Sequence, residues 1–219
     1  RGQLGDGTTT NSDVPVDVLG LTGGVKAIAA GQNHTCALTM GGTVKCWGAD
    51  DSGQLGGFWA ASVAAPHDVA GLGAPIRAIT AGLGHTCALT EGGAVKCWGA
   101  NESGQLGNGL TTMSYEPVDP IGLTGDVRAI AAGRAHTCAL AGSGGGARVL
   151  CWGNNRAGQL GDGTTIGHLT PQPSRGLAGT ASAINAGDFH TCAIVAGGGV
   201  NASILQCGGD SCSAQAGGN

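Results

Sequence analysis

The feature that most constrains the fold of this chain is a sequence unit that occurs four times. Each copy contains His-Thr-Cys-Ala followed by Leu or Ile, and the copies begin at His34, His85, His136 and His190. A regular period of about 50 residues is typical of arrays of small sheet units, because one such unit does not bury its own faces. Stacking of neighbouring copies must therefore supply the core.

Two further motifs complete each unit. Cys-Trp-Gly occupies residues 46–48, 97–99 and 151–153, and Gly-Gln-Leu-Gly occupies residues 2–5, 53–56, 104–107 and 158–161. The last unit departs from the pattern, with Cys207 followed by two glycines instead of Trp-Gly. Because the motif residues recur in every unit, we expect a structural role for them. We predict packing between units for Trp47, Trp98 and Trp152 and hydrogen bonding for the four histidines.

Nine cysteines are present, and eight of them form one pair in each unit. The pairs are Cys36 with Cys46, Cys87 with Cys97, Cys138 with Cys151, and Cys192 with Cys207. In the first unit, residues 35–39 and 43–47 read as two strands joined by a three-residue turn that ends in glycine. This hairpin places the two cysteines directly opposite each other, close enough for a disulfide.

The third and fourth units contain extra residues between their cysteines, at the position of the hairpin tip. Because both cysteines persist while the loop changes length, we interpret all four pairs as disulfides. The alternatives are reduced, packed thiols and a metal site, although zinc sites prefer cysteines two to four residues apart. Disulfides indicate a secreted, cell-surface or periplasmic location. The ninth cysteine, Cys212, falls outside these four pairs and is predicted to be unpaired or to form a disulfide with another chain.

Short apolar segments predict an all-β fold. In the first unit we expect four strands, over residues 14–19, 25–30, 35–39 and 44–48, and helical periodicity is absent. Four-stranded sheets stacked around an axis are the blades of a β-propeller. We therefore expect about four four-stranded blades, each with one disulfide. Their expected bounds are residues 1–48, 49–99, 100–153 and 154–219.

The combination Gly-x-x-His-Thr-Cys-Ala-Leu, Cys-Trp-Gly and Gly-Gln-Leu-Gly-x-Gly-Thr resembles the repeat of the regulator of chromosome condensation family. The resemblance implies a β-propeller, which has seven blades in members of that family. Because of its paired cysteines, the chain resembles a bacterial, exported branch of this family. Four repeats are too few for such a ring, so we expect either a longer parent chain or copies that complete one another.

Charge and composition argue against several functions. The chain has 10 Lys and Arg, 14 Asp and Glu, a net charge of −4 and no basic run, which disfavours nucleic-acid binding. No apolar run reaches the ~18 residues of a membrane span, so membrane insertion is not expected. No catalytic, metal-binding or cofactor motif appears, so we expect neither an enzyme nor a cofactor.

The stretches that differ between units are the predicted binding loops, at residues 11–16, 58–67, 110–117 and 166–174. Within them the candidate contact residues are Phe58, Trp59, His67, Met113, Tyr115 and His168. We expect an exported protein that binds other proteins. One alternative is a structural subunit whose partial propellers associate into an extracellular filament or surface layer. Another, implied by the founding nuclear member, is guanine nucleotide exchange on the small GTPase Ran, which the acidic balance and cysteines disfavour.

Overall fold

A computed structural model describes the chain except for residues 58–60, 143–145, 178, 197–201 and 208–219. The described part is built from antiparallel β-strands in four sheets. The first sheet contains β1 (Val25–Ala30), β2 (His34–Thr39), β3 (Val44–Ala49) and β4 (Ser62–Asp68). The second contains β5 (Ile76–Ala81), β6 (His85–Thr90), β7 (Val95–Gly99) and β8 (Ser114–Val118). The third contains β9 (Val127–Ala132), β10 (His136–Ala141), β11 (Arg148–Gly153) and β12 (His168–Pro173). The fourth contains β13 (Thr180–Ala186), β14 (Thr191–Ala196) and β15 (Ala202–Cys207).

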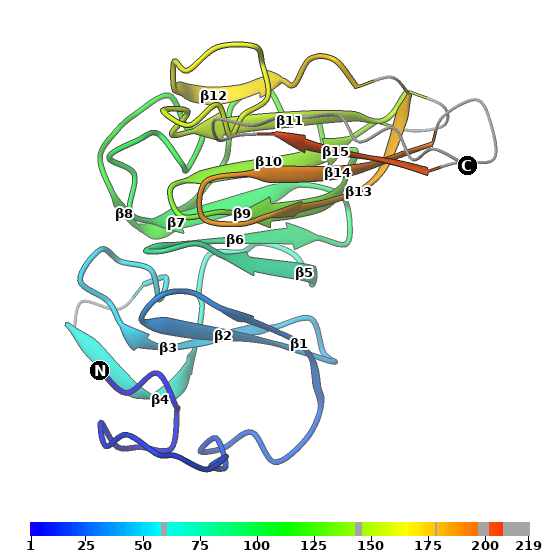
Figure 1. Ribbon diagram of the computed structural model, residues 1–219. Coiled ribbons are helices and arrows are strands. Elements are labelled where there is room, and N and C mark those ends of the chain that lie inside the picture. Colours follow the sequence, from blue (N-terminus) through cyan, green and yellow to red (C-terminus); the bar gives the residue numbers. More distant parts are fainter. Residues whose placement is uncertain (58–60, 143–145, 178, 197–201, 208–219) are drawn as a thin grey trace.

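The four sheets stack in chain order. Figure 1 shows the first sheet (blue) beside the second (teal to green), and β13 of the fourth sheet contacts β9, β10 and β11 of the third. Strands within a sheet are also adjacent in chain order, and the first strands contact each other from sheet to sheet (β1 with β5, β5 with β9, β9 with β13). This is the arrangement of propeller blades, with the first strand of each blade innermost. The predicted all-β propeller is therefore confirmed, as part of a ring.

The predicted hairpin between β2 and β3 is also present. Its turn ends at Gly42, whose φ of 78° is in the left-handed region that favours glycine. The register places Cys36 opposite Cys46, and the two are joined by a disulfide. The second sheet repeats this arrangement with Cys87 and Cys97.

In the third sheet the longer tip leaves the register intact, so Cys138 lies opposite Cys151 and is bonded to it. The fourth sheet differs. There Cys192 lies opposite Gln206 and Cys207 lies opposite Thr191, one position away from the register that pairs the cysteines.

Cys192 is accordingly a free thiol. The prediction of a Cys192–Cys207 disulfide, and with it one disulfide in every blade, was wrong for the fourth sheet. A shift of one residue is enough to separate two positions that would otherwise be opposed. The predicted fate of Cys212 lies outside the described residues.

The expected strand over residues 14–19 is not formed. The corresponding segments of later units are β4, β8 and β12, and each pairs with the third strand of the preceding unit. No such strand precedes residue 14 in this chain. The fourth strands β4, β8 and β12 therefore lie after the blade boundaries that we expected at the end of each Cys-Trp-Gly motif. The sheets run over residues 25–68, 76–118, 127–173 and 180–207.

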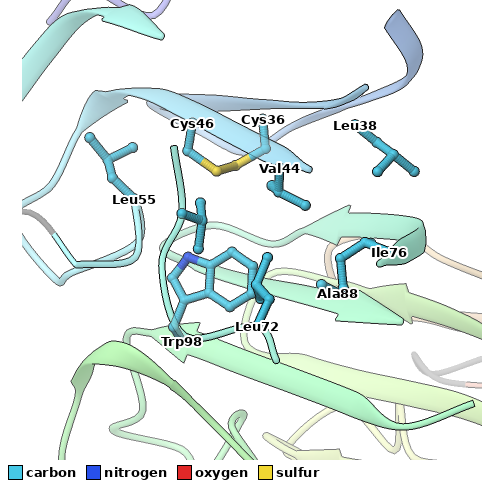
Figure 2. Packing of buried hydrophobic residues seen from close by; sticks show 10 residues of the cluster. Cys36, Leu38, Val44, Cys46, Leu55, Leu72, Ile76, Ala88 and Trp98 are labelled. Carbon is cyan, nitrogen blue, oxygen red and sulfur yellow. A yellow bond between two sulfur atoms is a disulfide. The ribbon is translucent and has the colours of Figure 1, made fainter. Parts of the chain in front are cut away.

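The core consists of three apolar clusters, one between each pair of neighbouring sheets. In the first cluster the Cys36–Cys46 disulfide and Leu38 of one sheet pack against Ile76 and Trp98 of the next (Figure 2). The disulfides are thus buried inside the joints between blades. The expected packing role of the tryptophans is seen for Trp98 and, in the second cluster, for Trp152.

Candidate functional site

The repeated histidines join neighbouring sheets. The Nε2 atom lies 2.9 Å from a threonine Oγ1 of the following sheet in three joints, which pair His34 with Thr86, His85 with Thr137, and His136 with Thr191. Thr86 and Thr137 already donate their only hydroxyl hydrogen to a glutamine carbonyl. Since the hydroxyl must then accept from the imidazole, Nε2 of His34 and His85 carries the hydrogen. His34, His85 and His136 therefore form hydrogen bonds, as predicted, although the bonds run to the next blade and not to the turn before their own strand. No such bond is present for His190 among the described residues.

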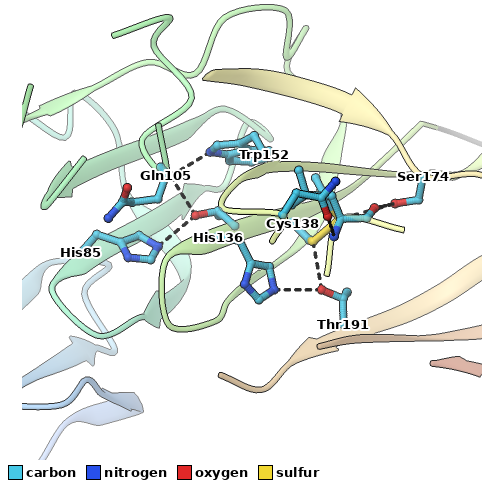
Figure 3. Close-up of a disulfide and its surroundings, with 11 residues drawn as sticks. His85, Gln105, His136, Cys138, Trp152, Ser174 and Thr191 are labelled. Atoms are coloured by element: carbon cyan, nitrogen blue, oxygen red, sulfur yellow. Dashed lines mark hydrogen bonds between the residues drawn. A yellow bond between two sulfur atoms is a disulfide. The ribbon is translucent and has the colours of Figure 1, made fainter. Parts of the chain in front are cut away.

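The glutamine of Gly-Gln-Leu-Gly completes the first two joints, through the carbonyls of Gln54 and Gln105. The Gln105 carbonyl accepts hydrogen bonds from Thr137 Oγ1 at 2.9 Å and from Trp152 Nε1 at 2.8 Å (Figure 3). The Gln105 side chain caps its own turn, because Oε1 accepts from Ser103 N at 2.9 Å. The three sequence motifs are therefore parts of one buried hydrogen-bonded joint.

Burial determines the charge state of these histidines. It lowers the pKa of His85 to about 3 and the pKa values of His34 and His136 to about 4. The imidazoles are therefore neutral at pH 7. Glycine is required at the start of Gly-x-x-His, because the ring of His85 lies where a side chain on Gly82 would stand. The repeated histidines are structural residues in this geometry.

A second repeated site shapes the loop between the third and fourth strands. In the second sheet the buried Asn101 accepts a hydrogen bond from Leu106 N at 2.9 Å. Its Nδ2 donates to the carbonyls of Leu110 and Thr112, both at 3.0 Å. Asn155 makes the corresponding bonds in the third sheet. One buried amide therefore holds the whole loop.

Asp50 takes the place of this asparagine in the first sheet. Its Oδ1 accepts from Leu55 N at 2.9 Å, as Asn101 Oδ1 does from Leu106 N. Its Oδ2, which stands in place of the amide nitrogen, is buried without a hydrogen-bond partner among the described residues. Burial raises the pKa of Asp50 to about 6.

The structure places four of the six predicted contact residues. Met113 is exposed, at 47% of its surface. Tyr115 lies in β8 and packs over Gly53, and His67 lies in β4 opposite Cys46, where burial lowers its pKa. His168 in β12 binds Asp162, with 2.7 Å between Nε2 and Oδ2. Phe58 and Trp59 lie outside the described residues.

The structure also exposes apolar residues that we did not name as contact residues, although Leu110 and Leu169 lie in two of the predicted binding loops. Leu110, Ile121 and Leu169 are 56%, 57% and 40% exposed. Gly109 connects them, since its N donates to the Leu169 carbonyl at 3.0 Å and its backbone lies against Ile121. We call Leu110, Met113, Ile121 and Leu169 the outer apolar patch. Large apolar side chains at positions that differ between units were the signal that could have found it.

A pocket opens on the propeller axis, where the turns between first and second strands meet. The non-repeated residues of its wall are Gln32, Leu83, Arg134 and Asp188. The Arg134 guanidinium stacks over Phe189, 5.5 Å from the ring centre. This wall holds no pair of groups arranged for acid-base or nucleophilic chemistry. Within the described residues no three His, Cys, Asp or Glu side chains gather as a metal site would require.

None of the described segments forms a helix with the length and apolar character needed to cross a bilayer.

Comparison with known proteins agrees with this architecture. Two models of the regulator of chromosome condensation (RCC1) repeat match the chain, one at residues 25–54, 76–105 and 127–159 and the other at residues 1–38, 93–140 and 147–194. The ultraviolet-B receptor UVR8 of Arabidopsis thaliana is 33% identical over 201 residues, which are 90% of this chain and 45% of the receptor.

Solved structures show the same fold. Human WBSCR16 superposes with a TM-score of 0.71 at 21% identity, over 84% of this chain and 47% of that one. Prp20p of Saccharomyces cerevisiae gives 0.68 at 27% identity, over 84% and 43%. The chain thus spans less than half the length of these proteins. The repeated joints, the stacked sheets and the matching models together show that the chain belongs to the RCC1 repeat family.

Proposed function

We propose that this chain is part of an exported, non-enzymatic propeller that binds another protein through its outer apolar patch. The observation that carries the proposal is the exposure of Leu110, Met113, Ile121 and Leu169, of which Ile121 and Leu169 lie beside Gly109, the residue before Leu110. The repeated polar residues are used within the joints, so they are not available to a partner. Apolar side chains left exposed together, at positions free of the repeat, are typical of interaction surfaces.

The loop that carries the patch is held in place before any partner binds. Asn101 is fully buried and binds the carbonyls on both sides of residue 111. A loop fixed in this way loses little conformational entropy on binding, which favours affinity. The proposed surface is therefore a rigid one.

Related propellers support a protein partner. Prp20p is described by its binding to Gsp1p and histones, and the yeast RCC1 protein has been solved bound to Kap60. For this chain too we propose a protein partner. The net charge of −4 favours a partner with a neutral or basic contact surface.

The cysteines support the exported location. Three disulfides are fully buried in joints, and such bonds persist in oxidising compartments. We therefore propose secretion or display at the cell surface, with the periplasm as the corresponding bacterial compartment. The same disulfide pairs support our proposal that the chain belongs to a bacterial, exported branch of the family.

Photocrosslinking tests the proposed surface. A photoreactive side chain at Met113 in the full chain is expected to capture a discrete protein from the extracellular fraction of the producing cells. The same group at Met40, which is exposed at a hairpin tip, is the matched control and should not capture it. The substitution Leu110→Asp should abolish the Met113 product. Equal capture from both positions, or none from Met113, contradicts the proposal.

A further inference from the structure

One proline position recurs in all four units and belongs to the outer rim of the propeller. Its copies are Pro15, Pro66, Pro117 and Pro171, which follow one another at the same intervals as the repeated histidines. Pro66 lies in β4, Pro117 in β8 and Pro171 in β12, and β12 also contains Pro173. Among the described residues β4, β8 and β12 each pair with one strand only, so they are the outer edges of their sheets. The repeat therefore places proline at an open sheet edge, which is where a sheet tolerates it.

The register shows which way the proline nitrogens of β12 point. Ser174 N donates to a carbonyl of β11 at 2.9 Å, and Gln172 lies opposite Cys151 in the same ladder. Residues of an antiparallel strand turn their backbone groups alternately toward the partner strand and away from it. Ser174 and Gln172 therefore point their N–H groups at β11. Pro171 and Pro173 hold the alternate positions, so their nitrogens face the open edge.

The outer strand of the first sheet is arranged in the same way. Val69 N donates to a carbonyl of β3 at 2.9 Å, so the alternate residues Asp68 and Pro66 face the open edge of β4. The Asp68 carboxylate is 70% exposed and pairs with Lys45, with 2.8 Å between Nζ and Oδ1. A charged side chain is a second means by which an edge strand resists pairing. The edge of β4 thus carries a proline and a charge at successive outward positions.

A loop covers the beginning of these edges. The carbonyl of Leu169, two residues before Pro171, accepts a hydrogen bond from Gly109 N at 3.0 Å. In β4 the carbonyl of Ala64, two residues before Pro66, accepts one from Gly7 N, also at 3.0 Å. These carbonyls are therefore not available to a further strand. Beyond them, the prolines remove N–H groups that a further strand would need.

We propose that the repeated prolines close the outer rim of the propeller to strand addition. A strand that adds to an open edge bonds to its N–H and carbonyl groups, but proline has no N–H and its ring projects toward the incoming strand. Partners are therefore held by side chains, and separate copies do not pair rim to rim. The outer edge belongs to each blade, whatever the number of blades in the ring. The proposal concerns the backbone of the rim and is independent of the outer apolar patch.

Restoring the missing N–H groups tests the proposal on the full oxidised chain. Threonine supplies an N–H and suits a strand, so one variant combines Pro66→Thr, Pro117→Thr, Pro171→Thr and Pro173→Thr. Sedimentation velocity should show that this rim variant associates to a several-fold higher mass than the unsubstituted chain at the same concentration. Hydrogen exchange followed by mass spectrometry should show slower exchange of the β4, β8 and β12 amides in the associated material than in dilute monomer.

Pro75→Thr is the matched control. Pro75 is exposed and lies in the linker before β5, against Gly42, so its replacement removes a proline without adding an N–H to the rim. This variant should sediment as the unsubstituted chain does. Near-ultraviolet circular dichroism checks that both variants keep the native packing. If the fourfold variant loses that signal, Pro171→Thr with Pro173→Thr confines the change to β12, and the same results are expected for that strand.

Two results would overturn the proposal. One is a folded rim variant that associates no more than the unsubstituted chain. The other is association in which the amides of the rim strands exchange as fast as in the monomer, because the contact then lies elsewhere. Failure of partner capture from Met113 in the unsubstituted chain would count against the proposed function alone.

Discussion

The third and fourth sheets carry the same cysteine motif but use it differently. Cys138 and Cys151 are opposed and bonded, whereas Cys192 faces Gln206 and is free. Both hairpins have lengthened tips, so length itself does not separate them. The fourth pairs Ala196 with Ala202, one step out of the register that the cysteines need. A cysteine pair in a hairpin therefore predicts a disulfide only where the strand register is also known.

The largest effect should come from breaking a complete joint. Trp152 is fully buried between the second and third sheets and donates to Gln105. Trp152→Ala removes a large side chain and an indole hydrogen bond, and we expect it to lower the free energy of unfolding by about 3–5 kcal/mol. Denaturant titration measures this loss. A loss below about 1 kcal/mol would show that the joints do not hold the array together.

Acid should weaken the three buried joints. Burial lowers the pKa of His136 to about 4 and that of His85 to about 3, against 6.5 for a free histidine. Below pH 6.5 the unfolded chain binds protons that the folded chain does not. The contribution of these histidines to the free energy of unfolding is therefore fully present above pH 6.5 and decreases as the pH drops toward 4 and 3. His136 contributes up to about 3 kcal/mol to this fall.

The substitution His136→Gln tests this prediction. It should flatten the dependence of the unfolding free energy on pH between pH 7 and pH 4.5, a range that includes the ordinary histidine pKa of 6.5 and stays above the lowered pKa of about 4. A slope equal to that of the unsubstituted chain would contradict the assignment.

The cysteines of the third and fourth sheets should differ in their contribution to the free energy of unfolding. Replacing Cys138 and Cys151 together by alanine removes a bond that closes a short loop, and we expect a loss of about 2–3 kcal/mol. Cys192→Ala removes only a partly exposed thiol and should change stability by less than about 0.5 kcal/mol. Thermal unfolding of the oxidised proteins measures both. Similar losses would indicate that Cys192 is bonded after all.

The smallest expected effect is a gain, at Asp50. The raised pKa of about 6 means that ionising this carboxyl opposes folding, so its penalty grows as the pH rises from 4 and is complete above 6. Asp50→Asn should raise the free energy of unfolding by about 1–2 kcal/mol at pH 7 and change it little at pH 4. The reverse substitution in the second sheet, Asn101→Asp, should lower the free energy of unfolding. A loss of stability in Asp50→Asn at pH 7 would contradict the comparison of the two loops.

The sequence predicted the local features of the fold well. The hairpin of Cys36 and Cys46 follows from a three-residue turn, and the tryptophan positions follow from the repeat. Both depend on residues close together in the chain. The register of the fourth hairpin was missed because a longer tip allows more than one alignment. The fourth strand of each blade was assigned to the wrong unit because its partner is the third strand of the preceding unit.

The candidate site was harder to predict. Exposure of a side chain depends on which neighbour covers it, and the neighbour comes from another unit. Tyr115 appeared available in the sequence but packs over Gly53, while Ile121 and Leu169 are exposed beside Gly109. The partner of each histidine was missed for the same reason, because Thr137 lies 52 residues from His85.

In this fold cysteines bond only where the sheet register opposes them, inside the joints between blades. Peptide mapping of the oxidised chain by mass spectrometry, without reduction, tests this most directly. We predict linked peptides for Cys36–Cys46, Cys87–Cys97 and Cys138–Cys151, and none for Cys192–Cys207. A linked Cys192–Cys207 peptide, or free thiols at the first three pairs, would contradict it.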